Sequence, residues 1–383
     1  MHIGFILTEY PHPKVTSHCG GIGTATHNIV LGLLKKNHNV SVFIYGQDNT
    51  ETITEGRFTL YKIIRNKYKF GGWYLYRKQL NKYINRIVAS KKINILEAPD
   101  WGGITAFMSF KVPIVLRLHG SDTYFCHLEK RKQKRKNYFF EKTAYKKADV
   151  IISVSQYTLE LTEQLFGVKK TAIVIQNGLF LDNFVTSKQF KTAKNIVLYF
   201  GSLVRKKGVL ELPYIFNELI KLNTEAQLIV IGRDVVDNVR NQSTLKLLKG
   251  KLSDTAQENF MYKGVLPYDK MRDEIAKASV CVFPSLAESF GMVTIEAMAL
   301  EKAIVNTNYS WAKEIMIDGK TGFLEDPKHH TPYAQKINRL LTDDTLRITL
   351  GEKAHNHVLT NFSMVKLVEK NITFYKKIID HEV

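Results

Sequence analysis

Two glutamates, Glu288 and Glu296, lie with seven residues between them, just after the apolar run 280–283. Glu288 falls in a loop, and a helix expected from about Gly291 places Glu296 in its early turns. The backbone N–H groups of residues 289–293 would then face an anion or a hydroxyl-rich ligand. Carboxylates accept hydrogen bonds from vicinal hydroxyls. An acidic first turn stabilises any helix, but this alternative explains only Glu296 and not the acidic loop before it.

Three consecutive cations, Arg205, Lys206 and Lys207, stand in a glycine-bounded loop after the apolar run 196–200. Cations at the end of a strand suit a pyrophosphate. For any single cation an ordinary solvated loop is the alternative. The place of this loop, at the first strand of the second half of the chain, favours the binding interpretation.

Two weaker candidates lie in the first half of the chain. The glycine cluster 19–24, which contains Gly21, precedes an expected helix at 24–36. Glycine lets the backbone approach a ligand, and a helix start offers N–H groups to an anion; a flexible turn is the alternative. His119 directly follows the apolar run 114–118, where function tends to concentrate, although a lone histidine is often structural.

Apolar runs of strand length alternate with amphipathic stretches of helix length, which predicts parallel sheets covered on both faces. The first set of expected strands is 3–7, 40–45, 93–96, 114–118, 150–154 and 172–175. The second set is 196–200, 227–231, 259–262, 280–283 and 303–305. Ligands of such sheets bind beyond the carboxyl ends of the strands, where the candidate residues above are found.

The length of 383 residues suits two domains. We expect an α/β domain at 1–185 and a second at 195–360, joined near the polar segment 183–194. A long helix expected in 361–383 would pack back on the first domain. The three cysteines are far apart in sequence, which excludes a disulfide framework and a cysteine-based zinc site.

No apolar stretch approaches the about 20 residues that span a bilayer, and the first residues read as a buried strand and not as a signal peptide. We therefore expect a cytoplasmic protein. A net charge of +19 attracts polyanions: nucleic acid, an anionic membrane or phosphorylated small molecules.

With these loops in place, the chain resembles the retaining family 4 glycosyltransferases of the GT-B fold, in which two Rossmann-like domains face a central cleft. The match follows the family's order over nearly the whole chain. The matching segments are Gly20–Gly23, Arg117–Gly120, Ala148–Ser155, Gln176–Gly178, Gly201 with Lys207–Gly208, and the pair Glu288 and Glu296.

The resemblance implies a role for each candidate residue. Glu288 would hold hydroxyls of the donor sugar, Glu296 the ribose, and Lys207 the pyrophosphate. Gly21 would let the backbone near the donor phosphate, and His119 would line the sugar site from the other domain. Further donor contacts are implied for the backbone of Phe290, Gly291, Met292 and Val293 and for Val265 beside the base.

One position departs from the family pattern. The family commonly has arginine directly after the glycine of the phosphate loop, where this chain has Ser202. Arg205 is the candidate replacement, although its place in the backbone differs.

The resemblance also implies the reaction. A sugar would pass from a UDP- or GDP-linked donor to a saccharide or lipid-linked acceptor, with retention and without a metal or other cofactor. The chain contains no Asp-x-Asp element, in agreement with this. A nucleotide-sugar epimerase on the same fold is the alternative enzyme.

Basic residues interleaved with aromatics occupy residues 57–96, which contain no acidic side chain, and a second basic run is 130–136. The aromatics of the first stretch are Tyr61, Tyr68, Phe70, Trp73, Tyr74, Tyr76 and Tyr83. The pattern favours peripheral contact with an anionic membrane, at its inner face, during surface polysaccharide assembly. Ordinary solvated helix faces with core aromatics are the alternative. A non-enzymatic nucleic-acid binder is the other rival, but no zinc-finger or RNA-recognition signature is present, and we expect no nucleic-acid partner.

Overall fold

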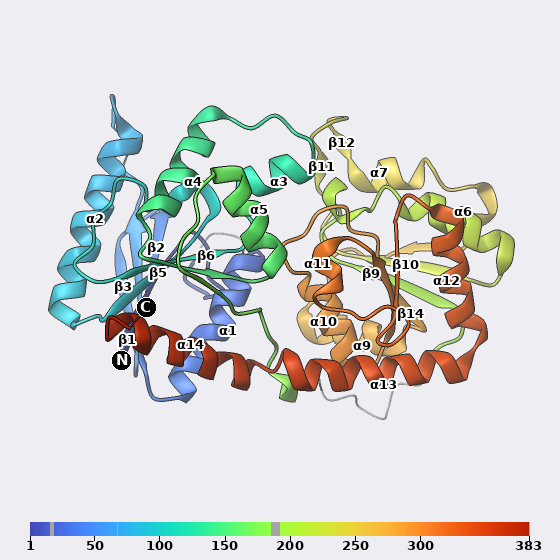
Figure 1. Cartoon of the computed structure of the whole chain (residues 1–383). Coiled ribbons are helices and arrows are strands. Elements are labelled where there is room, and N and C mark those ends of the chain that lie inside the picture. Colours follow the sequence, from blue (N-terminus) through green and yellow to red (C-terminus); the bar gives the residue numbers. More distant parts are fainter. Residues whose placement is uncertain (16–18, 67, 185–191, 383) are drawn as a thin grey trace. The chain divides into compact units, whose positions relative to one another are not determined.

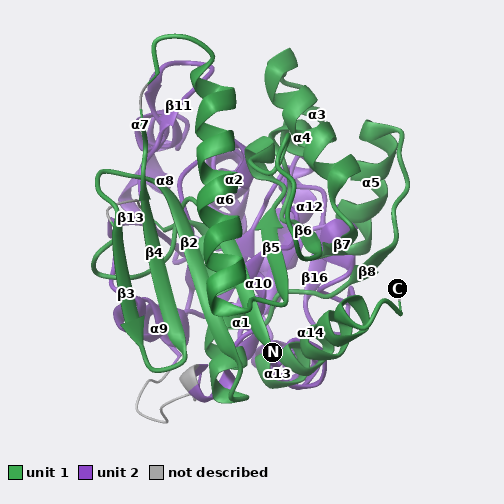
Figure 2. Ribbon diagram, turned by 90° about the vertical axis from the view of Figure 1, so that its left-hand side faces the viewer, with its two compact units in different colours: residues 1–178, 364–383 green, residues 179–363 purple. Residues whose placement is uncertain are grey.

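The computed structural model describes residues 1–15, 19–66, 68–184 and 192–382, and divides into two compact units (Figure 2). Unit 1 comprises Met1–Gly178 and Met364–Val383, and unit 2 comprises Leu179–Ser363. The chain thus passes between units after residue 178 and again after residue 363. Of the linker expected at 183–194, residues 185–191 lie outside the described residues.

Unit 1 is built on one eight-stranded sheet in the order β3-β4-β2-β1-β5-β6-β7-β8 (Figure 1). All neighbouring strands are parallel except the edge strand β3, which is antiparallel to β4. The strands are β1 (His2–Leu7), β2 (Asn39–Gln47), β3 (Glu51–Glu55), β4 (Phe58–Ile64), β5 (Ile95–Pro99), β6 (Ile114–Leu118), β7 (Val150–Ser153) and β8 (Ala172–Val174).

Helices of unit 1 bury apolar stripes against this sheet. Leu80, Ile84 and Val88 recur at helical spacing and pack into the same core as Ile6 of β1. The helices are α1 (Gly21–Lys35), α2 (Gly72–Lys91), α3 (Asp122–Leu128), α4 (Arg135–Lys147), α5 (Gln156–Phe166) and α14 (Met364–Ile379), with the 3-10 turn η1 (Trp101–Gly103). Among the described residues, no helix is long and apolar enough to cross a membrane.

A buried polar network ties α14 to the strands of unit 1. The Arg117 guanidinium of β6 donates to both carboxylate oxygens of Glu97, at 2.6 and 3.0 Å, and to Asn371 Oδ1 at 2.6 Å. The Tyr375 hydroxyl donates to Glu97 Oε2 at 2.6 Å. All four side chains are buried, so removing one partner would leave a charge without compensation. Arg117 therefore has a structural role in this unit.

Unit 2 repeats the parallel architecture with the sheet order β13-β10-β9-β14-β15-β16. Its strands are β9 (Ile196–Phe200), β10 (Gln227–Ile231), β13 (Phe260–Tyr262), β14 (Val280–Phe283), β15 (Ala303–Thr307) and β16 (Phe323–Glu325), beside the small pair β11 (Val236–Asp237) and β12 (Gln242–Ser243). Its helices are α6 (Leu212–Leu222), α7 (Thr244–Lys249), α8 (Asp254–Glu258), α9 (Tyr268–Lys277), α10 (Met292–Ala299), α11 (Ser310–Lys313), α12 (His330–Thr342) and α13 (Asp344–Asn361), with the 3-10 turns η2 (Leu181–Phe184) and η3 (Arg205–Lys207).

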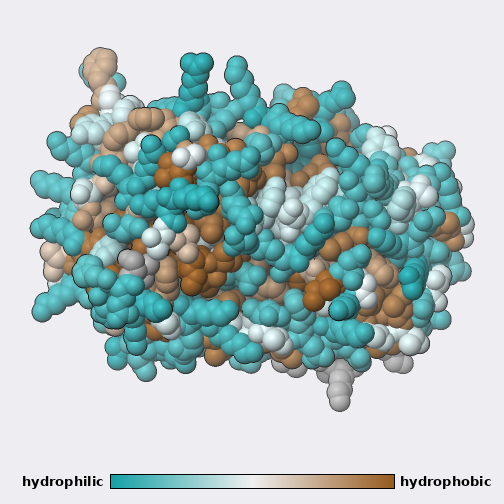
Figure 3. All heavy atoms as spheres, viewed as in Figure 1, coloured by the Kyte–Doolittle hydropathy of each residue, from teal (hydrophilic) through white to brown (hydrophobic). Residues whose placement is uncertain are grey.

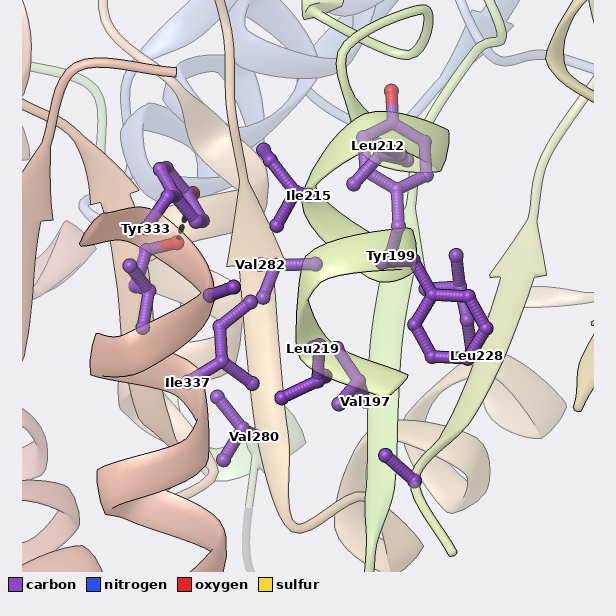
Figure 4. Close-up of a cluster of buried hydrophobic side chains, with 14 of the residues drawn as sticks. Val197, Tyr199, Leu212, Ile215, Leu219, Leu228, Val280, Val282, Tyr333 and Ile337 are labelled. Carbon is purple, nitrogen blue, oxygen red and sulfur yellow. Dashed lines mark hydrogen bonds between the residues drawn. The ribbon is translucent and has the colours of Figure 1, made fainter. Parts of the chain in front are cut away.

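Both faces of the unit 2 sheet are buried. Val280 and Val282 of β14 point into the cluster that contains α6 and α12 side chains (Figure 4). The alternating residues Cys281 and Phe283 are equally buried but lie outside that cluster, on the face where α10 and α13 contact β15. Two covered faces explain why these strands read as continuous apolar runs and not as an alternating pattern.

The structure corrects two sequence expectations. The helix expected at 24–36 begins at Gly21, so the supposed glycine loop forms the first turn of α1. The edge strands β3 and β16, and β4 next to β3, were not expected. β4 lies within the basic stretch 57–96, and its Lys62 is buried with its ammonium 3.4 Å from Glu51 of β3. The lysine made this strand hard to predict, because the glutamate that compensates its charge lies on the neighbouring edge strand.

Candidate functional site

Two loops at the carboxyl ends of β9 and β14 are packed directly on each other. The N–H groups of Leu286 and Ala287 donate to the carbonyl oxygen of Lys206, at 2.8 and 3.0 Å. Gly208 has φ +67, and a Cβ there would lie 1.6 Å from the carbonyl oxygen of Pro284. Only glycine permits this approach of backbone to backbone, which fixes the position of η3 relative to the loop before α10.

The packed loops bring Lys207 and Glu288 into an ion pair. The Lys207 ammonium contacts Glu288 Oε1, and the Ser285 hydroxyl donates to the same oxygen at 3.5 Å. The side chains of Lys207 and Glu288 are 21% and 11% exposed, so the pair is shielded but reachable. Burial, together with the charge of Glu288, raises the pKa of the Tyr199 hydroxyl well above the usual range. The sequence predicted both ion-pair residues as donor contacts but not their pairing.

Arg205 has a different partner. Its guanidinium donates two hydrogen bonds to the carboxylate of Asp237, at 2.9 and 2.8 Å. Hydrogen bonding from Arg205 lowers the pKa of Asp237. Ser202, the position where the family commonly has arginine, offers its carbonyl oxygen to Tyr199. The cation proposed to replace the family arginine is therefore already neutralised within unit 2, whereas Lys207 is paired at the loop before α10.

The start of α10 carries the second glutamate. Gly291 caps this helix at φ +96, and Met292 and Val293 occupy its first positions, where backbone N–H groups lack intrahelical acceptors. Phe290 is buried and packs its ring against Phe362, with centroids 5.7 Å apart, which anchors the loop before the helix. The structure thus puts a helix start directly beside the Lys207–Glu288 pair.

Glu296 sits in an environment that favours its neutral form. Burial raises the pKa of Glu296 to about 7, against the opposing effects of a 3.4 Å hydrogen bond from the Tyr268 hydroxyl and of the Lys207 charge. Glu296 lies in α10, the helix that begins four residues after Glu288 of the ion pair. Tyr268 is a contact that the sequence did not reveal, since only the fold brings α9 beside α10.

Val265 lies in the loop that leads from β13 to α9 and is 67% exposed. The carbonyl oxygen of the preceding Gly264 accepts a hydrogen bond of 2.8 Å from Gly232, which anchors this loop to the end of β10. Three residues further on, α9 begins with Tyr268, the partner of Glu296. The structure therefore connects Val265 to the cluster through Tyr268.

His119 lies at the end of β6 in unit 1. Its backbone N–H and that of Gly120 donate to the Asp100 carboxylate at 3.0 and 3.1 Å. Burial lowers the pKa of His119 to about 3, and the nearby Arg117 adds to this, so the imidazole is neutral at physiological pH. Burial also raises the pKa of Asp100 to about 7. His119 can accept or donate a hydrogen bond here, but it cannot supply a positive charge.

A buried carboxylate that the sequence did not single out organises the loops next to His119. Glu141 of α4 accepts hydrogen bonds from the backbone N–H groups of Gly102, Asp122 and Thr123, at 3.0, 3.0 and 2.9 Å, and from the Thr123 hydroxyl at 2.5 Å. It thereby fixes the start of α3 and the turn after β5. Nothing in its sequence context, a basic helix, distinguishes it.

Gly21 opens α1, and no described atom lies within 4 Å of the Cβ position that a larger residue would have there. The carboxylate of Glu9, from the segment after β1, accepts a 2.9 Å hydrogen bond from the Gly23 N–H group. One of the helix-start donors expected to bind phosphate therefore already has an anionic partner. This contact could not be predicted from local sequence, because Glu9 lies fourteen residues before Gly23.

The described residues of unit 2 gather Lys207, Glu288 and Glu296 around the start of α10, while Gly21 and His119 belong to unit 1. A cation, two carboxylates and helix-start N–H groups can together hold a ligand that is both anionic and rich in hydroxyls. No group of three or more His, Cys, Asp or Glu residues in the described ranges is arranged to hold a metal ion. Metal independence itself stays a prediction.

Comparison with known proteins gives matches to both halves of the chain. Residues 19–183 match the family model described as Glycosyltransferase Family 4, and residues 182–357 match that described as Glycosyl transferases group 1. An uncharacterized glycosyltransferase of Methanocaldococcus jannaschii is 27% identical and covers 95% of this chain and 96% of its own length. The capsular polysaccharide biosynthesis glycosyltransferase CapM of Staphylococcus aureus is 28% identical over 62% of this chain and 64% of that protein.

Solved structures match the whole architecture at low sequence identity. Sucrose-phosphate synthase from Thermosynechococcus elongatus has a TM-score of 0.81 at 16% identity, with all of both chains covered. HepE of Anabaena in complex with UDP and glucose has a TM-score of 0.75 at 17% identity, over 98% of this chain and 100% of that one. At these identities the likeness concerns the fold.

Proposed function

Because the chain belongs to the family 4 glycosyltransferases and has their GT-B fold, we propose that it transfers a hexose-type sugar from a UDP- or GDP-linked donor. The acceptor is a hydroxyl of a saccharide or of a lipid-linked saccharide, and the anomeric configuration is retained without a metal. The observation that carries the proposal is the Lys207–Glu288 ion pair beside Glu296 and the start of α10. The match to CapM, a capsular polysaccharide enzyme, supports a role in surface polysaccharide synthesis.

Donor binding would exchange the partners of the ion pair. A diphosphate at the start of α10 takes the Lys207 ammonium, and the sugar hydroxyls donate to the freed Glu288 carboxylate. Each charged group is therefore satisfied both before and after binding, which avoids leaving a shielded charge without a partner. Glu296 accepts from the ribose hydroxyls, with Tyr268 fixing its orientation.

The reaction that fits these groups is a front-side displacement. The acceptor oxygen forms a bond to C1 of the sugar on the face from which the diphosphate oxygen departs, and the acceptor proton passes to that leaving oxygen. Negative charge grows on the diphosphate, where Lys207 and the first N–H groups of α10 stabilise it. His119, neutral and buried, serves as a hydrogen-bond partner of the sugar and not as an acid.

The direct test is an activity assay with UDP- and GDP-hexoses, an oligosaccharide or lipid-linked acceptor, and EDTA. Release of nucleoside diphosphate with a product of unchanged anomeric configuration, by NMR and in the presence of EDTA, is expected. Inversion at C1 or loss of activity in EDTA would contradict the retaining or the metal-free part of the proposal. Conversion of the nucleotide sugar without diphosphate release would indicate an epimerase instead.

Peripheral contact with an anionic membrane is a separate part of the proposal. Of the aromatics in residues 57–96, Phe70, Trp73 and Tyr74 are exposed, by 86%, 42% and 44%, whereas Tyr61 is buried in the core. The exposed rings lie at and before the start of α2 among lysines and arginines, a combination that suits a lipid headgroup layer. A liposome pelleting assay that shows no preference for anionic over neutral vesicles would remove this part.

A further inference from the structure

A pocket of about 820 Å³ lies at the carboxyl edge of the unit 1 sheet. It is bounded by the ends of β1, β2 and β4, by the first turn of α2 and by the start of α4. None of the described residues that line it is acidic; they include three cations and four aromatics, Arg65, Arg77, Lys136, Tyr45, Tyr68, Trp73 and Tyr76. We call it the unit 1 pocket. None of the donor-site residues of unit 2 contributes to it.

Arg77 is the least expected member of this lining. Its side chain is buried, with 8% of its surface exposed, and it has no carboxylate partner in the part of the chain that the structure describes. The guanidinium donates only to backbone carbonyl oxygens, those of Trp73 at 3.2 Å and of Gly102 and Gly103 at 3.5 and 3.3 Å, and stacks on Phe140 at 4.2 Å.

The third nitrogen of this guanidinium, Arg77 Nε, is buried without any hydrogen-bond partner among the described residues. Burial lowers the pKa of Arg77. A buried cation and a buried donor that both lack an anion are costly, and such groups in folded proteins are normally satisfied. An anionic ligand against the exposed part of this guanidinium would supply the missing charge partner.

Two further cations stand at the same pocket. Arg65 follows β4 and Lys136 lies in the first turn of α4, and both are exposed and without a carboxylate partner among the described residues. Elsewhere in the same basic run, Arg131 is paired with Asp122 at 3.1 Å and with Glu129 at 3.6 Å. Exposed cations elsewhere on unit 1, such as Lys78 and Lys132, also lack a carboxylate partner among the described residues, so the distinguishing feature of the pocket is that two such cations adjoin the buried Arg77.

Aromatic rings form the other part of the lining. The centroid of the Trp73 ring lies 5.8 Å from the Lys136 ammonium, and the Trp73 side chain is 42% exposed. The Tyr76 hydroxyl accepts a 2.8 Å hydrogen bond from Gly46, which holds this ring against the end of β2. Brown and tan spheres lie among teal ones in Figure 3 over the part of unit 1 where Figure 1 places α2 and α4. An aromatic wall beside a group of cations suits a sugar that carries a phosphate.

We propose that the unit 1 pocket binds the phosphate group of a phosphorylated acceptor, with Arg65, Arg77 and Lys136 around the phosphate and Trp73 against the adjoining sugar ring. The inference rests on the proposed function, because it assigns the acceptor class of the same reaction. The phosphate can belong to a soluble sugar phosphate or to a lipid-linked one, and both present the same group to the guanidinium fork.

The test compares two double variants of the full chain with equal loss of charge. Arg65→Ser/Lys136→Ser removes the two exposed pocket cations, and Lys78→Ser/Lys132→Ser removes two exposed cations that do not line the pocket. All four side chains are exposed, so both variants should fold. Isothermal titration with UDP present, to fill the donor site, measures binding of glucose 1-phosphate, inorganic phosphate and glucose. Pelleting with phosphatidylglycerol and phosphatidylcholine vesicles measures the lipid arm.

The expected result is binding of glucose 1-phosphate that weakens about tenfold or more in the pocket variant and less than about twofold in the control, with little binding of glucose. If phosphatidylglycerol vesicles and not glucose 1-phosphate show this difference, the phosphate belongs to a lipid. Equal effects in both variants, or no binding of any phosphate probe to the wild type, would overturn the inference. Titration of UDP alone reports the donor site: if UDP binds and the phosphate probes do not, only this inference fails.

Discussion

Positively charged side chains at the strand ends are compensated differently in the two units. In unit 2, two of the three cations that follow the first strand are paired with carboxylates of the same unit, Lys207 with Glu288 and Arg205 with Asp237. At the corresponding edge of unit 1, the cations of the unit 1 pocket, including the buried Arg77, have no carboxylate partner among the described residues.

The difference indicates what each edge is suited to bind. A compensated pair fits a ligand that brings both an anion and hydroxyl groups, because each partner of the pair is replaced when the ligand enters. An uncompensated cluster fits the anionic group of a ligand without a hydroxyl exchange at the same residues. A nucleotide sugar presents its diphosphate and its sugar hydroxyls together to the paired charges, whereas a phosphorylated acceptor presents its phosphate alone to the cations of the pocket.

The largest effect is expected where unit 1 does compensate a buried charge. Arg117→Met leaves Glu97 buried and without its ion-pair partner, and should lower the free energy of unfolding by about 3–5 kcal/mol. Urea denaturation measures the loss. The control Arg131→Met breaks an exposed pair and should cost less than about 1 kcal/mol. Equal losses of unfolding free energy in the two variants would mean that unit 1 does not depend on pairing of its buried charges. The unpaired, buried Arg77 would then need no ligand to explain it.

A slightly smaller effect should follow from separating the two loops of the unit 2 site. Gly208→Ala places a Cβ against the Pro284 carbonyl oxygen at positive φ and should cost about 3 kcal/mol of unfolding free energy. Gly250→Ala, at φ −68 with only ordinary contacts, is the matched control and should be nearly neutral. Thermal unfolding of the two variants side by side decides. If Gly208→Ala unfolds at nearly the same temperature as wild type, the ion pair does not depend on contact between the two loops.

The two cations of the unit 2 loop should differ in catalysis. Lys207→Ala removes the charge at the start of α10 and should lower kcat/KM about 100-fold or more, as removal of one donor to a developing anion typically does. Arg205→Ala removes a cation already neutralised by Asp237 and should lower kcat/KM less than about tenfold. Steady-state kinetics with a nucleotide sugar measures both. A greater loss at Arg205 would place the diphosphate on the other side of the loop.

The smallest predicted effect is a pH dependence centred on Glu296. Its pKa in the folded chain is about 7, above the ordinary 4.5, so its ionisation makes the fold less stable as the pH rises from below 5 through 7. Glu296→Gln removes this loss, and its thermal midpoint relative to wild type should rise between pH 5 and pH 8.

Donor binding should show the opposite trend at the same residue. Ribose hydroxyls donate to the carboxylate form, so the affinity of wild type for a nucleotide sugar should increase a few-fold from pH 6 to pH 8, while Glu296→Gln binds weakly at every pH. Calorimetric titration at both pH values is the measurement. A wild-type affinity independent of pH would argue against contact between Glu296 and the donor.

Much of the fold could be predicted from the sequence, because strands buried on both faces produce apolar runs. β6, β9, β10 and β14 have the expected bounds. β4 was missed since Lys62 interrupts its apolar run, and the compensating Glu51 belongs to an antiparallel edge strand that no local pattern reveals. β16 was missed because its three residues are too few for a periodic pattern.

The site was predictable as a set of residues and not as a set of contacts. Lys207 and Glu288 were identified from their places at strand ends and from the family resemblance. Their ion pair, the Arg205–Asp237 pair and the hydrogen bond of Tyr268 join residues far apart in the chain. Such contacts depend on how strands are ordered in a sheet. The pocket around Arg77 escaped notice for the same reason, since its lining comes from five separate elements.

The measurement that tests the central claim most directly is calorimetric titration of UDP- and GDP-hexoses into three proteins: wild type, Lys207→Ala and Arg65→Ser/Lys136→Ser. The account predicts that one donor binds wild type and the unit 1 double variant with similar affinity, and that Lys207→Ala binds it at least about tenfold more weakly. Donor binding that survives in Lys207→Ala, or that is lost in the unit 1 variant instead, would contradict the assignment of the donor to the paired charges of unit 2.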